Sequence, residues 1–168
     1  HHIPGVEAST GSLGHGLSLG IGMALAARYD RRDSRTFVIL GDGECNEGSI
    51  WEAAMCASKH GLDSLTVLID YNHYQSSGST YDIQDLEPFV AKWQSFGWGA
   101  LDINGHDVGE LRRVLGALPN VASRPTAIIC HTVKGKGISF AENNLEWHHK
   151  SKITDEQIGS LLAELETP

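Results

Sequence analysis

The chain has 168 residues, which is enough for one domain with a proper hydrophobic core. Hydrophobic residues make up 40% of it and charged residues 20%, the usual composition of a globular protein. Its net charge of -8, without a basic stripe, argues against nucleic acid or an anionic membrane as the partner.

The cysteines are scattered, form no CxxC pair and are odd in number, so they predict no closed disulfide framework: Cys45, Cys56 and Cys130. We therefore expect a reducing, cytoplasmic setting. No apolar run approaches the length of a membrane span. The chain opens without a methionine, so we expect a single domain over 1–168 that lacks upstream residues.

Predicted elements alternate along the first half of the chain. Glycine and small residues over 11–27 predict a loop followed by a closely packed helix. The apolar run 36–40 predicts a strand, and 49–60 predicts a helix that Gly61 closes. A second apolar run, 65–69, predicts the next strand and is followed by a polar loop.

The same alternation continues to the end of the chain, with predicted helices over 85–96, 107–118 and 154–166 and predicted strands over 99–103 and 126–133. The strands are continuous apolar runs, which is typical of strands covered on both faces. Strands that alternate with helices indicate βαβ units. We therefore predict an α/β fold with a mostly parallel sheet between layers of helices.

Polar residues follow the first two predicted strands. Gly41-Asp42-Gly43 comes directly after the first strand, and Asn72 comes after the second. Ligands of such sheets bind at the carboxyl ends of the strands. Because one βαβ crossover separates Asp42 from Asn72, neighbouring strands can present a carboxylate and an amide oxygen to one point. These hard oxygen ligands suit Mg²⁺ or Ca²⁺.

The two glycines of this motif let the backbone pass close to a ligand, and Gly43 can offer its N–H to a phosphate. A Gly-Asp-Gly sequence alone is usually only a turn. Its placement together with Asn72 favours the other interpretation, a site that holds a metal-bridged diphosphate.

Three longer motifs extend this interpretation: PGVEASTGSLGHG at 4–16, GDGECNEGSIWEA at 41–53 and TVKGKGISFAENNLEWHHK at 132–150. They resemble the cofactor-binding half of transketolase, a thiamine diphosphate enzyme. The last motif is especially similar to transketolase halves encoded as separate subunits. The resemblance covers nearly all of residues 4–150 and implies a three-layer α/β/α thiamine diphosphate-binding fold.

The resemblance implies a metal and diphosphate site. Asp42, the side-chain oxygen of Asn72 and the backbone carbonyl of Tyr74 would coordinate Mg²⁺ or Ca²⁺. Gly41 and Gly43 would join Asp42 and Asn72 in binding thiamine diphosphate, with Gly43 in contact with its diphosphate.

The resemblance also implies roles outside the metal site. Gly11 and Leu13 would line the aminopyrimidine pocket. Glu47 and Glu52 match catalytic acids that lie at the subunit interface and link two active sites. His148 matches a catalytic histidine near the reacting carbon.

Three of these residues also have a simpler interpretation. Leu13 can be a core residue. Ser49 and Glu52 have the spacing of a capping box at a helix start, which would explain Glu52 without an interface. His148 can be a solvated surface histidine.

The implied activity is that of a transferase that moves a two-carbon ketol unit from a ketose or ketose phosphate donor to an aldose acceptor. In the family, the glutamate that activates the aminopyrimidine lies on a separate pyrimidine-binding domain, which does not fit within this length. We therefore expect activity only with a pyrimidine-domain partner subunit, in a heterotetramer where this chain dimerises. Two alternatives are a subunit of another thiamine diphosphate enzyme acting on 2-oxo acids and a non-catalytic phosphate-binding module.

Overall fold

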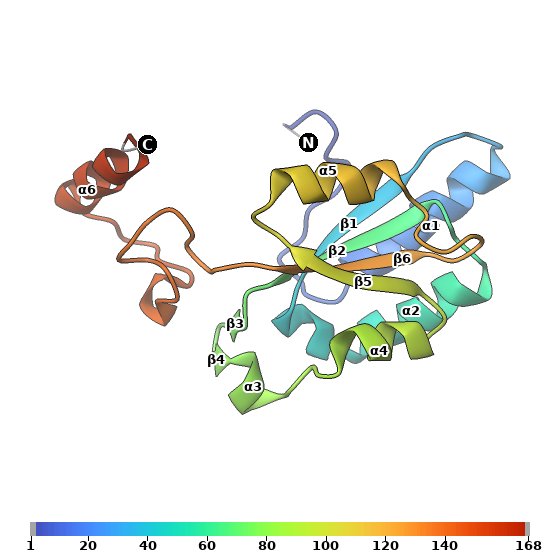
Figure 1. The fold of residues 1–168 in the computed structure, drawn as a ribbon, viewed down its shortest axis with the longest axis horizontal. Coiled ribbons are helices and arrows are strands. Elements are labelled where there is room, and N and C mark those ends of the chain that lie inside the picture. The colour runs from blue at the N-terminus through green and yellow to red at the C-terminus, as the bar shows by residue number, and fades with distance from the viewer. Residues whose placement is uncertain (1–2, 167–168) are drawn as a thin grey trace.

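A sheet of four parallel strands in the order β1-β2-β6-β5 forms the centre of the computed structural model, which describes residues 3–166 (Figure 1). Its strands are β1 (Thr36–Gly41), β2 (Leu65–Tyr71), β6 (Thr126–His131) and β5 (Gly99–Asn104). All three strand pairings are parallel, so the predicted parallel sheet is confirmed.

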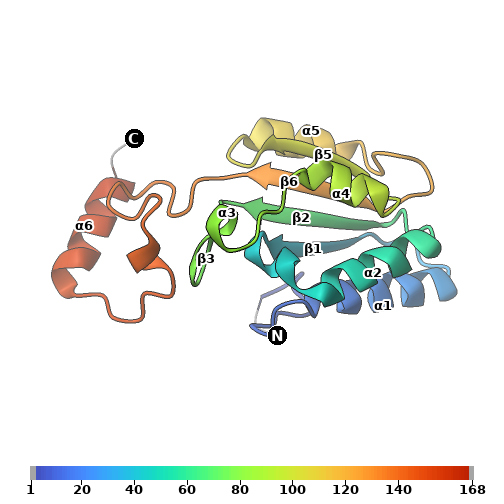
Figure 2. The same ribbon diagram turned by 90° about the horizontal axis from the view of Figure 1, so that it is seen from below.

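Helices cover both faces of this sheet, so the three-layer arrangement is confirmed (Figures 1 and 2). One face packs against α1 (Gly16–Tyr29), α2 (Gly48–Lys59) and α4 (Phe89–Ser95). The opposite face packs against α5 (Val108–Gly116). The larger of the two hydrophobic cores lies on the face that carries three helices.

Small residues on α2 make room for large aromatic residues in this larger core. Ala53, Ala54 and Ala57 are buried on the helix, and Trp93 and Trp98 are buried opposite them. The indole N–H of Trp98 donates to the carbonyl of Ala54 at 2.9 Å, which satisfies the polar atom of a buried ring. These contacts fix α2, whose first turn follows the Gly-Asp-Gly motif, against α4.

The outer face of β1 departs from the prediction that the strands are covered on both faces. The described residues leave Phe37 45% exposed and Ile39 77% exposed. The helix on that side, α5, packs over β5 and β6 and does not extend across β1. The guanidinium of Arg35 lies 5.4 Å from the ring centre of Phe37 and partly shields it.

Short elements occupy the polar loop after β2. A hairpin of β3 (Tyr74–Gln75) and β4 (Gly78–Ser79) leads into α3 (Thr80–Ile83). The sequence prediction missed all three elements. Beyond β6, the chain leaves the sheet, forms η2 (Leu145–Trp147) and ends in α6 (Asp155–Leu165), which lies apart from the sheet (Figures 1 and 2).

Most predicted helices agree with the structure to within a few residues, but the one over 85–96 begins only at Phe89. Pro88 disfavours helical backbone at Glu87. A carboxylate oxygen of Glu87 instead accepts from the N–H of Phe89 at 2.8 Å. The predicted end of α2 is confirmed, since Gly61 follows the helix with a φ of +53°.

The predicted capping box at the start of α2 is wrong. The helix begins at Gly48, its N-cap residue is Glu47, and no side chain caps it. The hydroxyl of Ser49 donates instead to the carbonyl of Gly14, at 3.1 Å. Glu52 is therefore not explained by capping.

We predict opposite effects for alanine at two glycines of α1. A Cβ on Gly20 would overlap Cγ2 of Val38, a stiff β-branched side chain on β1. Gly20→Ala should therefore lower the free energy of unfolding by about 1–3 kcal/mol. At exposed Gly22 nothing lies within 4 Å of the added Cβ. Gly22→Ala should raise the free energy of unfolding by about 0.5–1 kcal/mol through helix propensity. Urea unfolding measures both, and a shared direction would contradict the predicted packing of α1 on β1.

Candidate functional site

Asp42 and Asn72 lie at the carboxyl edge of the sheet, each one residue beyond a strand. The strands β1 and β2 are direct neighbours, with Gly41 paired to Asp70. Asp42 is 1% exposed and Asn72 is 8% exposed, so both polar side chains are withdrawn from solvent. The predicted placement of these two residues on adjacent strand ends is confirmed.

The carboxylate of Asp42 reaches across from β1 to the turn after β2. One oxygen accepts from the N–H of Gly43 and the other from the N–H of His73, each at 2.6 Å. Because His73 directly follows Asn72, the side chain of Asp42 meets the turn that carries the amide. Both strand ends therefore contribute to one small region.

Burial raises the pKa of the Asp42 carboxyl, and the charge of Asp70 raises it further. The hydrogen bonds from Gly43 and His73 act in the opposite direction but do not cancel the burial. No lysine or arginine among residues 3–166 forms an ion pair with Asp42, so a cation beside the ionised carboxylate would lower the free energy of the site.

The donor atoms at this edge fit a hard divalent cation. Each oxygen of Asp42 accepts one backbone hydrogen bond, which leaves lone pairs for a metal. Among the described residues, the amide oxygen of Asn72 accepts only from the N–H of Tyr74, at 3.0 Å. Within 3–166, no group of three His, Cys, Asp or Glu could hold a metal, so a cation here would need amide or carbonyl oxygens as well. Coordination by Asp42, Asn72 and Tyr74 stays a prediction.

Gly43 is a glycine because the β3–β4 hairpin passes very close to it. A Cβ at this position would lie 2.5 Å from Oε1 and 2.6 Å from Cβ of Gln75. Its N–H, which the sequence analysis offers to a phosphate, donates to Asp42 in this structure. The Gly-Asp-Gly motif therefore has two structural roles: it ends β1, and it packs against the β3–β4 hairpin.

Glu44 joins the N-terminal loop to the Gly-Asp-Gly motif, a role that the sequence analysis missed. One carboxylate oxygen accepts from the N–H of Gly14 at 3.0 Å and the other from the N–H of Gly41 at 3.1 Å. Gly14 is buried with a φ of +81°, and its carbonyl accepts from Ser49. In the sequence, the only indication of this role is that Glu44 directly follows the Gly-Asp-Gly motif and is not needed as a metal ligand.

The loop residues assigned to the aminopyrimidine pocket lie just before this clamped glycine. Gly11 is exposed, and nothing would lie within 4 Å of a Cβ added to it. Leu13 is 53% exposed, so its interpretation as a core residue is wrong. An exposed leucine held beside a fixed Gly14 is available to contact a ligand.

Glu47 and Glu52 lie at the start of α2, and both are exposed. Neither carboxylate forms a hydrogen bond or an ion pair with any residue that the structure describes. Contacts within the described chain therefore do not explain why acidic residues occupy these two positions.

His148 lies beside the hairpin rather than free in solvent. Its Nε2 lies 3.3 Å from the hydroxyl of Ser76, and Nε2 of His149 lies 3.1 Å from the same hydroxyl. The other ring nitrogen of His148 is buried and has no hydrogen-bond partner in the described chain. Burial lowers the pKa of His148, as do the charges of Lys134 and His149. A half-buried histidine with a lowered pKa replaces the expected alternative of a solvated one.

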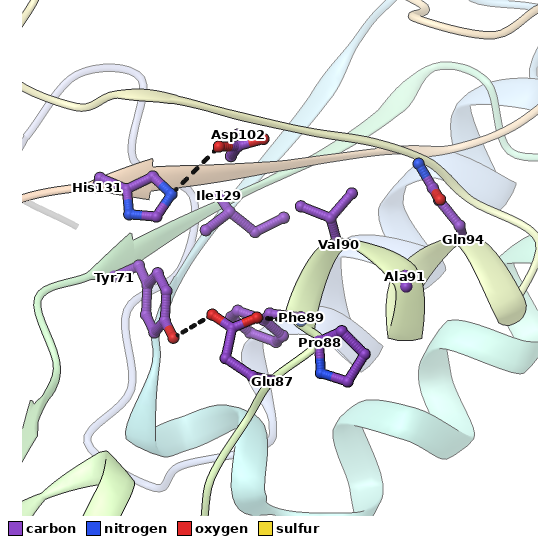
Figure 3. Close-up of a pocket in the computed structure, with 10 residues that line it drawn as sticks. All are labelled: Tyr71, Glu87, Pro88, Phe89, Val90, Ala91, Gln94, Asp102, Ile129 and His131. Atoms are coloured by element: carbon purple, nitrogen blue, oxygen red, sulfur yellow. Dashed lines mark hydrogen bonds and ion pairs between the residues drawn. The ribbon is translucent and has the colours of Figure 1, made fainter.

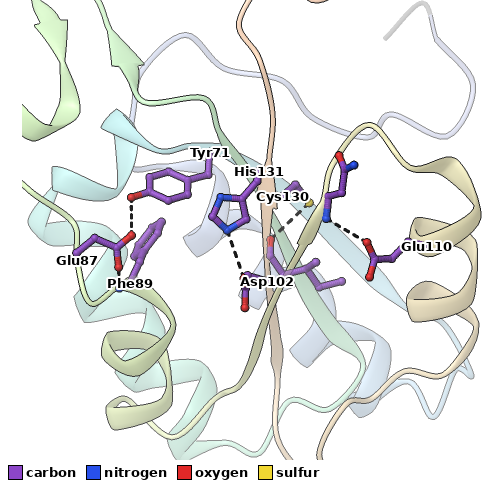
Figure 4. Close-up of polar contacts among 9 residues, drawn as sticks. Tyr71, Glu87, Phe89, Asp102, Glu110, Cys130 and His131 are labelled. Atoms are coloured by element: carbon purple, nitrogen blue, oxygen red, sulfur yellow. Dashed lines mark hydrogen bonds and ion pairs between the residues drawn. The ribbon is translucent and has the colours of Figure 1, made fainter.

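A separate cavity of about 320 Å³ opens beside α4 (Figure 3). Two polar pairs line it: the hydroxyl of Tyr71 donates to Glu87 at 2.7 Å, and His131 lies 3.4 Å from Asp102 (Figure 4). Burial and the hydrogen bond to Glu87 raise the pKa of Tyr71. None of the predicted site residues lines this cavity.

Comparison with known proteins identifies clear relatives. The family model described as the thiamine diphosphate binding domain of transketolase matches residues 1–165. One subunit of an apulose-4-phosphate transketolase from Phocaeicola vulgatus is 45% identical over 147 residues, which cover 88% of this chain and 52% of the relative. Subunit SqwG of a 6-deoxy-6-sulfo-D-fructose transketolase from a Clostridium species is 43% identical over 162 residues, covering 96% and 58%.

Solved structures give the same result. A transketolase from Pichia stipitis in complex with sedoheptulose-7-phosphate superposes with a TM-score of 0.85 at 28% identity, covering 97% of this chain and 25% of that one. A transketolase from Campylobacter jejuni gives a TM-score of 0.78 at 30% identity, covering 84% and 23%. The chain spans only about half the length of the curated subunits that it matches.

We predict that Glu44→Ala loosens the loop before α1. The two N–H groups bound by Glu44 should exchange with solvent roughly tenfold faster or more, because a hydrogen bond to a charged group contributes about 1.5–3 kcal/mol. Hydrogen–deuterium exchange at Gly14 and Gly41 measures this directly. Glu47→Ala, which removes a carboxylate without internal hydrogen bonds, is the matched control. Equal exchange in both variants would show that Glu44 does not hold the loop.

Proposed function

The chain belongs to the transketolase thiamine diphosphate-binding family, and we propose that it is the cofactor-binding part of a ketol transferase. It would help to move a two-carbon unit from a ketose or ketose phosphate to an aldose. The main support is the convergence of Asp42 and the turn after Asn72 at one buried edge of the sheet. Sequence relatives that are named as transketolase subunits support the same reaction class.

Thiamine diphosphate would supply the electron sink that breaking a carbon–carbon bond next to a carbonyl requires. The role of this chain is to hold the anionic end of that cofactor. Asp42, Asn72 and the carbonyl of Tyr74 would bind Mg²⁺ or Ca²⁺, and the metal would neutralise the diphosphate. Gly41 and Gly43 would allow the diphosphate to approach the backbone.

Two further segments would complete the site. Gly11 and Leu13 would contact the aminopyrimidine, supported by their exposure beside the fixed Gly14. His148 would exchange a proton or a hydrogen bond with the substrate. Its lowered pKa favours the neutral ring, the form that can accept a proton.

We also propose that the active site forms between chains. Relatives of which this chain covers only 52% and 58% are themselves named as single subunits of a transketolase. A pyrimidine-binding partner would supply the remaining half of the site, in a heterotetramer with two copies of this chain. Glu47 and Glu52, which are exposed and unpaired within the described part, would meet at the contact between those copies.

The described part of the chain has no helix long and apolar enough to cross a membrane. Separately, we propose a reducing, cytoplasmic setting because Cys45, Cys56 and Cys130 are all free thiols.

We predict that Asp42→Ala weakens Mg²⁺-dependent binding of thiamine diphosphate by more than about 100-fold. Substitutions that only orient a metal ligand already cost roughly 10–100-fold, and this one removes the ligand. Isothermal titration calorimetry with and without Mg²⁺ measures the effect. Asp102→Asn, a change on β5 at an exposed carboxylate, is the control and should bind normally. Unchanged binding by Asp42→Ala would exclude the proposed metal site.

The activity is tested by mixing the purified protein with its pyrimidine-domain partner. Ketol transfer should appear only in the mixture and only with ketose or ketose phosphate donors. A parallel screen with 2-oxo acids distinguishes transketolase chemistry from that of other thiamine diphosphate enzymes. Full turnover without the partner would refute the shared active site, and turnover of 2-oxo acids alone would refute the ketol transfer.

A further inference from the structure

Asp70, the next-to-last residue of β2, contacts two of the three predicted metal ligands, Asp42 and Asn72. One of its carboxylate oxygens accepts from the side-chain amide of Asn72 at 3.0 Å. Its backbone carbonyl accepts from the N–H of Asp42 at 3.2 Å. No other described residue hydrogen-bonds to both of these ligands.

The hydrogen bond between Asp70 and Asn72 determines the orientation of the Asn72 side-chain amide, that is, the directions in which its nitrogen and its oxygen point. An ionised carboxylate only accepts hydrogen bonds, so the amide nitrogen of Asn72 has to face Asp70. The amide oxygen is then directed to the other side, where it accepts from the N–H of Tyr74. A flipped amide would place oxygen against oxygen at Asp70 and nitrogen against N–H at Tyr74, which is unfavourable at both ends.

The second carboxylate oxygen of Asp70 connects the site to a third strand. It accepts a hydrogen bond from the hydroxyl of Thr132, which directly follows β6. The carboxylate is therefore held from both sides and cannot rotate freely. Its position is set by the pairing of β2 with β6 rather than by the conformation of a loop.

Asp70 itself is exposed to solvent, so these contacts are not forced by burial. An exposed carboxylate that loses its hydrogen-bond partners can be solvated, and its contribution to the stability of the fold is small. A substitution at this position can therefore change the site while the fold stays intact.

We propose that Asp70 is a positioning residue for the metal site. Its side chain orients the amide oxygen of Asn72 toward the cation, whereas its backbone carbonyl, which Asp70→Ala would keep, accepts from the N–H of Asp42. This inference rests on the proposed function, because it assumes that Asp42 and Asn72 bind a divalent cation. Outer groups of this kind commonly change metal affinity by about 10–100-fold.

The test is a double-mutant cycle read by Mn²⁺ binding. The free Mn²⁺ signal in electron paramagnetic resonance gives the dissociation constant in the presence of thiamine diphosphate. Asp70→Ala should weaken Mn²⁺ binding by about tenfold or more. In the Asn72→Asp background both side-chain oxygens are equivalent, so no orientation remains to be fixed. There Asp70→Ala should leave the affinity unchanged or improve it, because it also removes a like charge.

Asp102→Ala, at an exposed carboxylate on β5, is the matched control and should bind Mn²⁺ normally. Melting temperatures without metal should agree among wild type, Asp70→Ala and the control to within a few degrees. Equal losses from Asp70→Ala in both backgrounds would overturn the orienting role, as would wild-type affinity in Asp70→Ala alone. If the wild-type chain binds no Mn²⁺ with thiamine diphosphate even together with its pyrimidine-domain partner, the proposed function fails instead.

Discussion

The hydrogen bonds of one buried carboxylate connect the two strand ends on which the site depends. Asp42 accepts from the N–H of Gly43 on its own strand and from that of His73 beyond the neighbouring strand. Each bond replaces water that a nearly fully buried carboxylate has lost. Because hydrogen bonds alone do not restore the free energy of hydration, the site favours a cation. The parallel pairing of β1 with β2 sets the distance over which this bridge forms.

The fold was largely predictable because its strands are long apolar runs and its helices end at recognisable residues. The failures occurred where the deciding contact is distant or absent. The sequence predicts that the outer face of β1 is buried, because Ile39 is as apolar as its neighbours. In the structure, no described element covers this face. The hairpin after β2 is polar, and each of its strands is only two residues long. Its sequence therefore contains no hydrophobic alternation that would predict a strand. The late start of α4 was different, because Pro88 is a local signal that the periodicity argument overlooked.

The candidate site, like the fold, was predictable in part. Asp42 and Asn72 could be paired from sequence because strand ends in a parallel sheet meet at one edge. Glu44 and Asp70 could not, although both lie within two residues of the motif residues. Each has one partner close in sequence, but the other lies 30 residues away at Gly14 and 62 residues away at Thr132, and only the packed structure brings these together. Sequence patterns identify groups at a ligand site more readily than the groups that hold them in place.

The acids at this edge perform different tasks because their surroundings differ. Asp42 is buried and faces the adjoining turn, Glu44 uses both oxygens on backbone N–H groups, and Asp70 uses both on side chains. None of them forms an ion pair with a lysine or arginine among residues 3–166. The charge of Asp70 acts against ionisation of Asp42, and the hydrogen bonds from N–H groups offset only part of the cost of the buried charge. A divalent cation would supply the missing charge, and its own preference for oxygen ligands matches what Asp42 and Asn72 present. Metal binding and the local folding of this edge are therefore expected to be coupled.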